Sequence, residues 1–308
     1  MDKPPRETAR PVVRRSQSWR DEERRVSGET ATIKALLARF GLHPQKGFGQ
    51  NFLRDNRYLS RIADAADLSA ADLVIEVGPG LGVLTRELAS RAGRVVAVEI
   101  DRGMAAALQA LLGEAPAERQ NVEVVNADIL QTDPAELLAG QPYKVVANLP
   151  YYISSSALRH FLEARVKPSL MITMVQREVA ERIMAPPGRL NLLAISVRLY
   201  GTPRIVTLVP SQAFYPPPKV DSAVLRIDVL PRPALDVDPD KFFKVVSAGF
   251  SARRKQIHNA LAQRLWLPAD STTAVLEEAG IDPKCRAETL RMEEWGSLVW
   301  ALERREVL

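Results

Sequence analysis

The chain has 308 residues, 46% of them hydrophobic, and a formal net charge of +5 at pH 7, which suits one large α/β domain plus a smaller one. No apolar run approaches the ~18–20 residues that span a bilayer, and the N-terminus lacks the apolar core of a signal peptide, so we expect a cytoplasmic protein. Cys285 is the only cysteine, which excludes an intramolecular disulfide, and the three histidines lie far apart. We therefore expect no metal site.

The first predicted segment is a basic tail. Residues 1–28 hold eight Lys or Arg against five Asp or Glu, and they show few large apolar residues and no periodicity. Such a composition predicts disorder. Residues 30–42 then have helical spacing that ends at a glycine, residues 43–54 read as a glycine-punctuated loop, and a further helix is expected through Ala66.

Strands and helices alternate from residue 73 onward. The predicted strands are 73–78, 94–100, 122–128, 143–149 and 169–176, and the helices between them are 83–92, 103–112, 134–140 and 156–165. Apolar strands alternating with helices predict an α/β fold, a Rossmann-like doubly wound parallel sheet. Residues 204–209 and 220–230 are two more strands, expected as an antiparallel edge. We assign residues 29–232 to this domain.

The rest of the chain, residues 233–308, is predicted to be a smaller helical domain that follows a Pro-rich linker at 230–239. Residues 241–264 contain six Lys or Arg and no acid. Within this stretch, residues 250–264 are expected to form one helix, and three consecutive cations cannot all lie on its buried side. We expect these three, Arg253, Arg254 and Lys255, to bind RNA phosphates, although a solvated charged face is the alternative.

A glycine loop lies between the first strand and its helix, in the sequence Glu76-Val77-Gly78-Pro79-Gly80-Leu81-Gly82. Glycines let the backbone approach a ligand closely. Glu99 ends the second strand, where a carboxylate can accept both hydroxyls of a ribose. The loop fits S-adenosylmethionine or a nicotinamide dinucleotide, and its spacing favours the former. A tight turn without ligand is a third interpretation.

Asp128 closes the third strand. Its carboxylate is expected to accept a hydrogen bond from the adenine amino group of the cofactor, or else to cap the following turn. Two acids at successive strand ends behind a glycine loop favour an adenosyl pocket.

The fourth strand ends in Asn148-Leu149-Pro150-Tyr151, the most specific local motif of the chain. The exocyclic nitrogen of adenine is a poor nucleophile because its lone pair is delocalised into the ring. The side-chain carbonyl of Asn148 and the backbone carbonyl of Leu149 or Pro150 can accept its two N–H groups and direct the lone pair at a methyl donor. Tyr151 offers a face for base stacking. The alternative is an ordinary turn.

Phe214 begins a second aromatic segment, Phe214-Tyr215-Pro216-Pro217-Pro218. It could stack on the other face of a flipped base, and a Pro-rich hairpin with packed aromatic residues is an equal alternative.

With these motifs the chain resembles the small-subunit ribosomal RNA adenine dimethyltransferases, which modify two adjacent adenosines near the 3′ end of 16S rRNA. The resemblance runs from about residue 30 to the C-terminus and includes GFGQNFL, EVGPGLGVLT, NLPY, SQAFYPPPKVDSAV and FSARRKQIHNAL. It implies S-adenosylmethionine as cofactor and a role in small-subunit biogenesis. It also implies cofactor contacts at Asn51, Leu53, Gly78, Glu99, Asp128 and Asn148, and a base pocket of Asn148, Leu149, Pro150, Tyr151 and Phe214.

Two departures from the family pattern stand out: Tyr152 replaces a common asparagine, and Pro187-Gly188-Arg189-Leu190-Asn191 replaces a Y-G-R-L-S-like stretch. The expected partner is small-subunit rRNA, within a pre-ribosomal 30S particle, and the protein is expected to be a monomer. The alternatives are a large-subunit rRNA adenine methyltransferase of the antibiotic-resistance type, a mainly non-catalytic ribosome-assembly factor, and a nicotinamide-dependent dehydrogenase.

Overall fold

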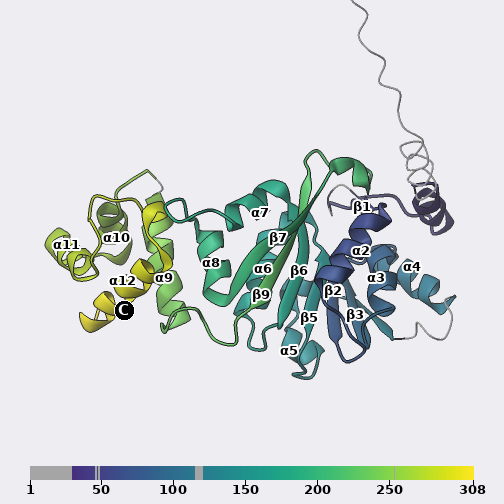
Figure 1. Cartoon of the computed structure of the whole chain (residues 1–308), viewed down its shortest axis with the longest axis horizontal. Helices are drawn as coiled ribbons and strands as arrows, with labels where there is room; N and C mark the ends of the chain where they lie inside the picture. The colour runs from purple at the N-terminus through teal and green to yellow at the C-terminus, as the bar shows by residue number, and fades with distance from the viewer. Residues whose placement is uncertain (1–29, 46, 48, 115–120, 253) are drawn as a thin grey trace, which may run out of the picture.

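The computed structural model describes residues 30–45, 47, 49–114, 121–252 and 254–308, and it shows an α/β part followed by a helical part (Figure 1). The predicted basic tail, residues 1–28, lies outside the described residues. Within the described ranges, no helix is both long and apolar enough to cross a membrane.

The α/β part is built on a seven-stranded sheet with the order β4-β3-β2-β5-β6-β9-β7. Five neighbouring strands are parallel: β2 (Leu73–Val77), β3 (Arg94–Glu99), β4 (Val122–Asn126), β5 (Lys144–Asn148) and β6 (Leu170–Gln176). The last two strands, β9 (Ser222–Val229) and β7 (Gly201–Val209), pair antiparallel. The predicted doubly wound sheet with an antiparallel edge is therefore confirmed.

Both faces of the sheet are buried, which explains the near-continuous apolar strands. Successive side chains of a strand point to opposite faces. Val74 accordingly belongs to one apolar cluster, with Leu59 and Leu88 of the covering helices, whereas Ile75 belongs to another, with Phe161. The helices of this part are α2 (Asn56–Ala65), α3 (Val83–Ala89), α4 (Arg102–Gly113), α5 (Pro134–Leu137), α6 (Ser154–Glu163), α7 (Arg177–Ile183) and α8 (Leu192–Tyr200).

The order in which the chain adds strands to the sheet reverses between β2 and β5, and a ligand can enter at this point. From β2 the chain winds outward to β3 and β4, then returns to the other side of β2 as β5. Where the chain leaves two neighbouring strands in opposite directions, the connecting helices lie on opposite faces of the sheet. A crevice then opens at the carboxyl ends of these two strands. The predicted glycine loop and the Asn148 motif follow β2 and β5, so both lie at this crevice.

A small two-stranded ribbon was not predicted from the sequence. β1 (Phe52–Leu53) pairs antiparallel with β8 (Phe214–Tyr215), so the 43–54 loop is joined to a segment that is remote in the sequence. Residues 30–39 are helical as predicted, and their Ile33 and Leu37 pack with Phe52 and Leu81. The N-terminal helix therefore covers the glycine loop.

The helical part contains α9 (Pro239–Gly249), α10 (Ile257–Leu265), α11 (Ala269–Glu278) and α12 (Met292–Arg304), gathered beyond α8 at one end of the molecule (Figure 1). Its buried side chains belong to the same apolar cluster as one face of the sheet. Tyr200 of α8 contacts Phe243 of α9 with ring centroids 6.2 Å apart. The division at residues 232 and 233 remains a prediction, because the core is continuous across it.

The single helix expected over residues 250–264 is wrong. Phe250–Ala252 form one 3-10 turn, and α10 begins only at Ile257. The amide of Ile257 donates to Cys285 O at 2.8 Å, and that of His258 donates to Pro283 O at 3.4 Å. Because these amides bond to the 283–285 loop and not to the preceding turn, the helix cannot extend backward. No helix or strand was predicted over residues 177–200, where α7 and α8 lie.

Gly249→Ala is expected to destabilise the helical part. A Cβ at Gly249 would lie 2.5 Å from the Cη2 of Trp295, whose fully buried ring is stacked on Phe250 at 5.7 Å and cannot move aside. We expect a loss of about 1–3 kcal/mol in the free energy of unfolding, measured by chemical denaturation.

Gly113→Ala provides the matched control, because Gly113 also ends a helix but has open space at its Cβ position. That variant should be neutral or more stable by up to about 1 kcal/mol. Equal effects of the two substitutions would contradict a steric role for Gly249.

Candidate functional site

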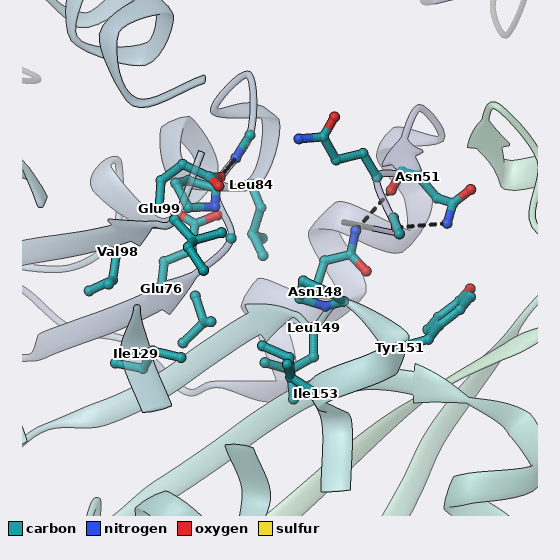
Figure 2. A pocket seen from close by; sticks show the side chains of 18 of the residues that line it. Asn51, Glu76, Leu84, Val98, Glu99, Ile129, Asn148, Leu149, Tyr151 and Ile153 are labelled. Atoms are coloured by element: carbon teal, nitrogen blue, oxygen red, sulfur yellow. Dashed lines mark hydrogen bonds between the residues drawn. The ribbon is translucent and has the colours of Figure 1, made fainter. Parts of the chain in front are cut away.

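A pocket opens at the carboxyl ends of β2, β3, β4 and β5, where the sequence motifs converge (Figure 2). It is lined by all the predicted cofactor-binding residues and by most of the predicted catalytic ones: Asn51, Leu53, Glu76, Gly78, Gly80, Glu99, Asp128, Asn148, Leu149, Pro150 and Tyr151. Phe214 does not line it.

The glycine loop requires its glycines. Gly78, Gly80 and Gly82 have φ of 66°, 55° and 73°, in the left-handed region that other residues rarely adopt. A Cβ at Gly80 would also lie 2.9 Å from the ring of Phe52. The backbone of the loop can therefore run close to the N-terminal segment and to any ligand between them.

Glu99 is hydrogen-bonded to the glycine loop. Its carboxylate accepts from Gly80 N and from Asp101 N, each at 3.0 Å, and the side chain is buried. Burial raises the pKa of the Glu99 carboxyl. Asp101 in turn accepts from the side-chain amides of Gln45 and Gln50, each at 3.2 Å, so the 43–54 loop is anchored to the same carboxylate network.

Glu76 has a different environment from Glu99. Its side chain is 1% exposed, and its Oε2 is buried without a hydrogen-bond partner among the described residues. Burial raises the pKa of Glu76 to about 8, and the negative charge of Glu99 acts in the same direction. A buried acceptor without a donor, at the wall of a pocket, fits a cationic ligand group such as an ammonium.

Asn148 lies between the acidic pair and the ring of Tyr151 (Figure 2). Its Nδ2 donates to the backbone oxygen of Asn51 at 3.3 Å, and Asn51 Nδ2 donates to Gly49 O at 2.9 Å. With its amide nitrogen engaged, Asn148 has the side-chain carbonyl free to accept. The N-terminal segment thus sets the orientation of the central polar group of the pocket.

The structure distinguishes the two backbone carbonyls that the motif offers. Pro150 O already accepts from Ile153 N at 3.1 Å and from Ser154 Oγ at 3.2 Å. Among the described residues, nothing donates to Leu149 O. Leu149 therefore supplies the second free acceptor beside Asn148.

Tyr151 is held by a residue that the sequence analysis missed. Its hydroxyl shares a 2.7 Å hydrogen bond with Ser222 Oγ at the start of β9, and Ser222 is fully buried. This bond fixes the far end of the ring, while the ring itself borders the pocket. No local signal in the sequence links Ser222 to Tyr151, 71 residues earlier.

Phe214 lies behind the pocket wall. It is 1% exposed, pairs with Leu53 in the β1–β8 ribbon and belongs to the apolar cluster that includes Leu59. In this geometry it supports the wall and offers no free face for stacking. Its stacking on a base stays a prediction that requires a rearrangement of the ribbon.

Asp128 forms the turn cap that was one of its two predicted roles, and its contact with adenine stays a prediction. One carboxylate oxygen accepts from Leu130 N at 2.9 Å and caps the 3-10 turn Ile129–Gln131, and the residue also lines the pocket. Tyr152, one of the two departures from the family pattern, is 54% exposed at the same rim. A Cβ at Gly49 would lie 3.7 Å from its ring.

Two of the three predicted RNA-binding cations, Arg254 and Lys255, do not line the pocket. Arg253 lies outside the described residues, whereas Arg254 and Lys255 are exposed in the turn before α10. Within the described ranges, no group of three or more His, Cys, Asp or Glu side chains is placed to hold a metal ion.

The chain is similar in sequence to known proteins over most of its length. The family described as ribosomal RNA adenine dimethylase matches residues 42–303. The "Ribosomal RNA small subunit methyltransferase A" of Dehalococcoides mccartyi strain 195 is 50% identical over 271 residues, 87% of this chain and 91% of that protein. The protein of the same name from Pelotomaculum thermopropionicum is 43% identical over 287 residues, 89% of this chain and 96% of that protein.

Two solved structures are similar in fold as well as in sequence. A dimethyladenosine transferase from Plasmodium falciparum superposes with a TM-score of 0.69 at 25% identity, covering 83% of this chain and 98% of that one. The 23S rRNA methyltransferase ErmE superposes with a TM-score of 0.65 at 32% identity, covering 82% of this chain and 100% of that one.

The buried Glu76 carboxyl predicts a pH-dependent stability. Its pKa rises from 4.5 to about 8 in the folded protein, so between these values the unfolded chain loses a proton that the folded chain retains. Stability therefore falls as pH rises from about 5 to 8. In Glu76→Gln this loss should disappear, a difference on the order of a few kcal/mol at pH 8 without ligand.

Chemical denaturation of both proteins across this pH range measures the effect. Glu136→Gln is the control, because Glu136 is exposed on α5, and its stability curve should parallel that of the parent. If the Glu76→Gln curve also ran parallel to the parent, the carboxyl would not be buried in its neutral form.

Proposed function

The chain belongs to the ribosomal RNA adenine dimethylase family, and we propose that it transfers methyl groups from S-adenosylmethionine to N6 of adenosine in small-subunit rRNA, giving N6,N6-dimethyladenosine. The observation that carries this proposal is the pair of free acceptors, Asn148 Oδ1 and Leu149 O, at the pocket between the glycine loop and Tyr151. The intact acceptors argue against a purely non-catalytic assembly factor.

Cofactor binding is assigned to the acidic side of the pocket. Glu99 would accept from the ribose hydroxyls, and Asp128 would accept from the adenine amine through its second carboxylate oxygen. Gly78 and Gly80 would let the cofactor lie close to the backbone of the glycine loop. The Oε2 of Glu76, which has no hydrogen-bond partner among the described residues, would accept from the ammonium group. When bound, S-adenosylmethionine supplies a methyl group that its sulfonium already activates, so no covalent enzyme nucleophile is needed.

The protein's own contribution to the chemistry is to position and polarise the target amine. Asn148 Oδ1 accepts one N–H and Leu149 O the other, which favours a pyramidal nitrogen whose lone pair points out of the ring plane. Tyr151, held by Ser222, stacks on the base and keeps it from rotating. Both acceptors are oriented before substrate binds, so little reorganisation is needed during transfer.

The names of the relatives support a narrower choice of substrate. Those at 43–50% identity carry a small-subunit name, whereas the 23S rRNA methyltransferase is 32% identical. The proposed targets are the two adjacent adenosines near the 3′ end of 16S rRNA, within a pre-ribosomal 30S particle in the cytoplasm. The protein acts as a monomer without a metal, and residues 233–308 hold the particle while the α/β part handles the base.

The first test identifies the product. Incubation with radiolabelled S-adenosylmethionine and unmethylated small or large ribosomal subunits, followed by nucleoside analysis, should give N6,N6-dimethyladenosine from the small subunits. Label confined to large-subunit RNA, or to cytosine, would contradict the proposal.

Asn148→Ala should impair turnover far more than binding. Removing one pre-oriented polar group that acts in the transition state typically costs roughly 10²-fold or more in kcat. Single-turnover kinetics measure the rate, and filter binding measures the affinity for small-subunit rRNA, which should remain near the parental value.

Asp128→Asn is the matched variant on the cofactor side, because asparagine can still cap the turn at Leu130. It should weaken cofactor binding about two- to tenfold, the value of one hydrogen bond, with nearly normal turnover at saturating cofactor. A normal rate in Asn148→Ala would show that Asn148 is not an acceptor for the amine.

A further inference from the structure

Tyr152 lines the pocket but has no part in the proposed function. It is 54% exposed, and no described residue hydrogen-bonds to its hydroxyl. The family commonly has asparagine at this position, so the fold does not require an aromatic ring there. A half-exposed ring at the mouth of a pocket is a surface that a ligand can bury.

The backbone after β5 determines the direction of the Tyr152 ring. Tyr151–Ile153 form a 3-10 turn, and three residues per turn send consecutive side chains in three different directions. Tyr151 extends to Ser222, to which its hydroxyl is bonded, and Ile153 packs against the apolar cluster on one face of the sheet. Tyr152 takes the third direction, toward the mouth of the pocket.

Two features place the ring on the acidic side of the pocket. Partial burial raises the pKa of the Tyr152 hydroxyl, and the negative charges of Asp128 and Glu99 act in the same direction, so the hydroxyl lies within reach of both charges. A Cβ at Gly49 would lie 3.7 Å from Cδ1 of the ring, so only the width of a methyl group separates the ring from the 43–54 loop. The ring therefore extends from the end of β5 toward this loop, beside the two acids.

Exposed apolar surface accompanies the acids on this side of the pocket. Ile100 follows Glu99, is 43% exposed and lines the pocket together with Tyr152. Carboxylates that can accept from hydroxyls and an amine thus lie beside apolar side chains that can cover a flat ring, a combination that suits an adenosine. The target base has a different place, because Asn148 lies between Glu99 and the ring of Tyr151 (Figure 2).

We propose that Tyr152 covers the adenosine end of bound S-adenosylmethionine and slows the release of the cofactor before and after methyl transfer. This inference rests on the proposed function, in which Glu99 and Asp128 bind that end. The ring keeps water from the two carboxylates, and hydrogen bonds are electrostatically stronger where water is excluded. Asparagine is too short to extend from β5 toward the 43–54 loop, so a chain with asparagine here lacks the cover.

Cofactor release matters for a dimethylation. Two methyl groups on one amine consume two cofactor molecules, so the spent cofactor must leave before the second can bind. A side chain that covers the adenosine end therefore acts on the interval between the two transfers. It leaves the transfer itself unchanged, because the acceptors for the amine are Asn148 Oδ1 and Leu149 O.

The test compares Tyr152→Asn with the parent in calorimetric titrations of the full-length, RNA-free protein. Affinity for S-adenosylmethionine and for its demethylated product, S-adenosylhomocysteine, should fall about two- to tenfold, the value of one aromatic contact. The change should lie mainly in the dissociation rate, measured by chasing bound radiolabelled cofactor. In steady-state methylation, KM for the cofactor should rise while kcat does not fall. Tyr152→Phe keeps the ring and should bind nearly as the parent does.

Trp266→Asn is the matched control, because Trp266 is 91% exposed, does not line the pocket and has φ 56°, which asparagine tolerates. Its cofactor affinity should equal that of the parent.

Parental cofactor affinity and release in Tyr152→Asn would overturn the inference. A loss confined to rRNA affinity, measured by filter binding, would also overturn it and assign Tyr152 to the nucleic acid. An equal loss in Tyr152→Phe would show that the ring is not the cover. A parent that binds S-adenosylmethionine but does not methylate small subunits would contradict the proposed function alone and leave this inference standing.

Discussion

The hydrogen bond from Asn148 Nδ2 to the backbone oxygen of Asn51 is the constraint on which the site depends. A primary amide has one donor end and one acceptor end, so engaging the donor leaves the acceptor facing the pocket. Because the partner is a backbone carbonyl of the N-terminal segment, the orientation of Asn148 depends on how that segment is held. The Gln45 and Gln50 amides hold it to Asp101, and the β1–β8 ribbon holds it on the other side.

The wall of the pocket is therefore a composite of remote segments. Phe52 lies against Gly80, Leu53 pairs with Phe214, and Ser222 holds the hydroxyl of Tyr151. Each contact restrains a group that would otherwise rotate freely. Pre-orientation of this kind matters for methyl transfer to a weak nucleophile, because positioning and polarisation are the main contributions a protein can make.

In the proposed function, the helical part binds the nucleic acid and the α/β part performs the chemistry. The acids that line the pocket would bind a small cationic ligand, whereas the exposed Arg254 and Lys255 lie on the helical part. That part nevertheless shares its apolar core with one face of the sheet, through contacts such as Tyr200 with Phe243. A shared core restrains the distance between the proposed RNA-binding surface and the pocket, and this restraint would favour adenosines at a set distance along a bound strand.

The sequence by itself determined the features whose residues are neighbours along the chain. The strands were predictable because strands buried on both faces are continuously apolar, and the glycine loop and the Asn148 motif because each is one uninterrupted segment at a strand end. Only the tertiary structure decided that Asn148 bonds to Asn51, 97 residues earlier, that Phe214 is buried behind the wall and that α10 begins at Ile257. These outcomes depend on hydrogen bonds and packing between distant segments, and local spacing carries no information about which distant atoms will meet.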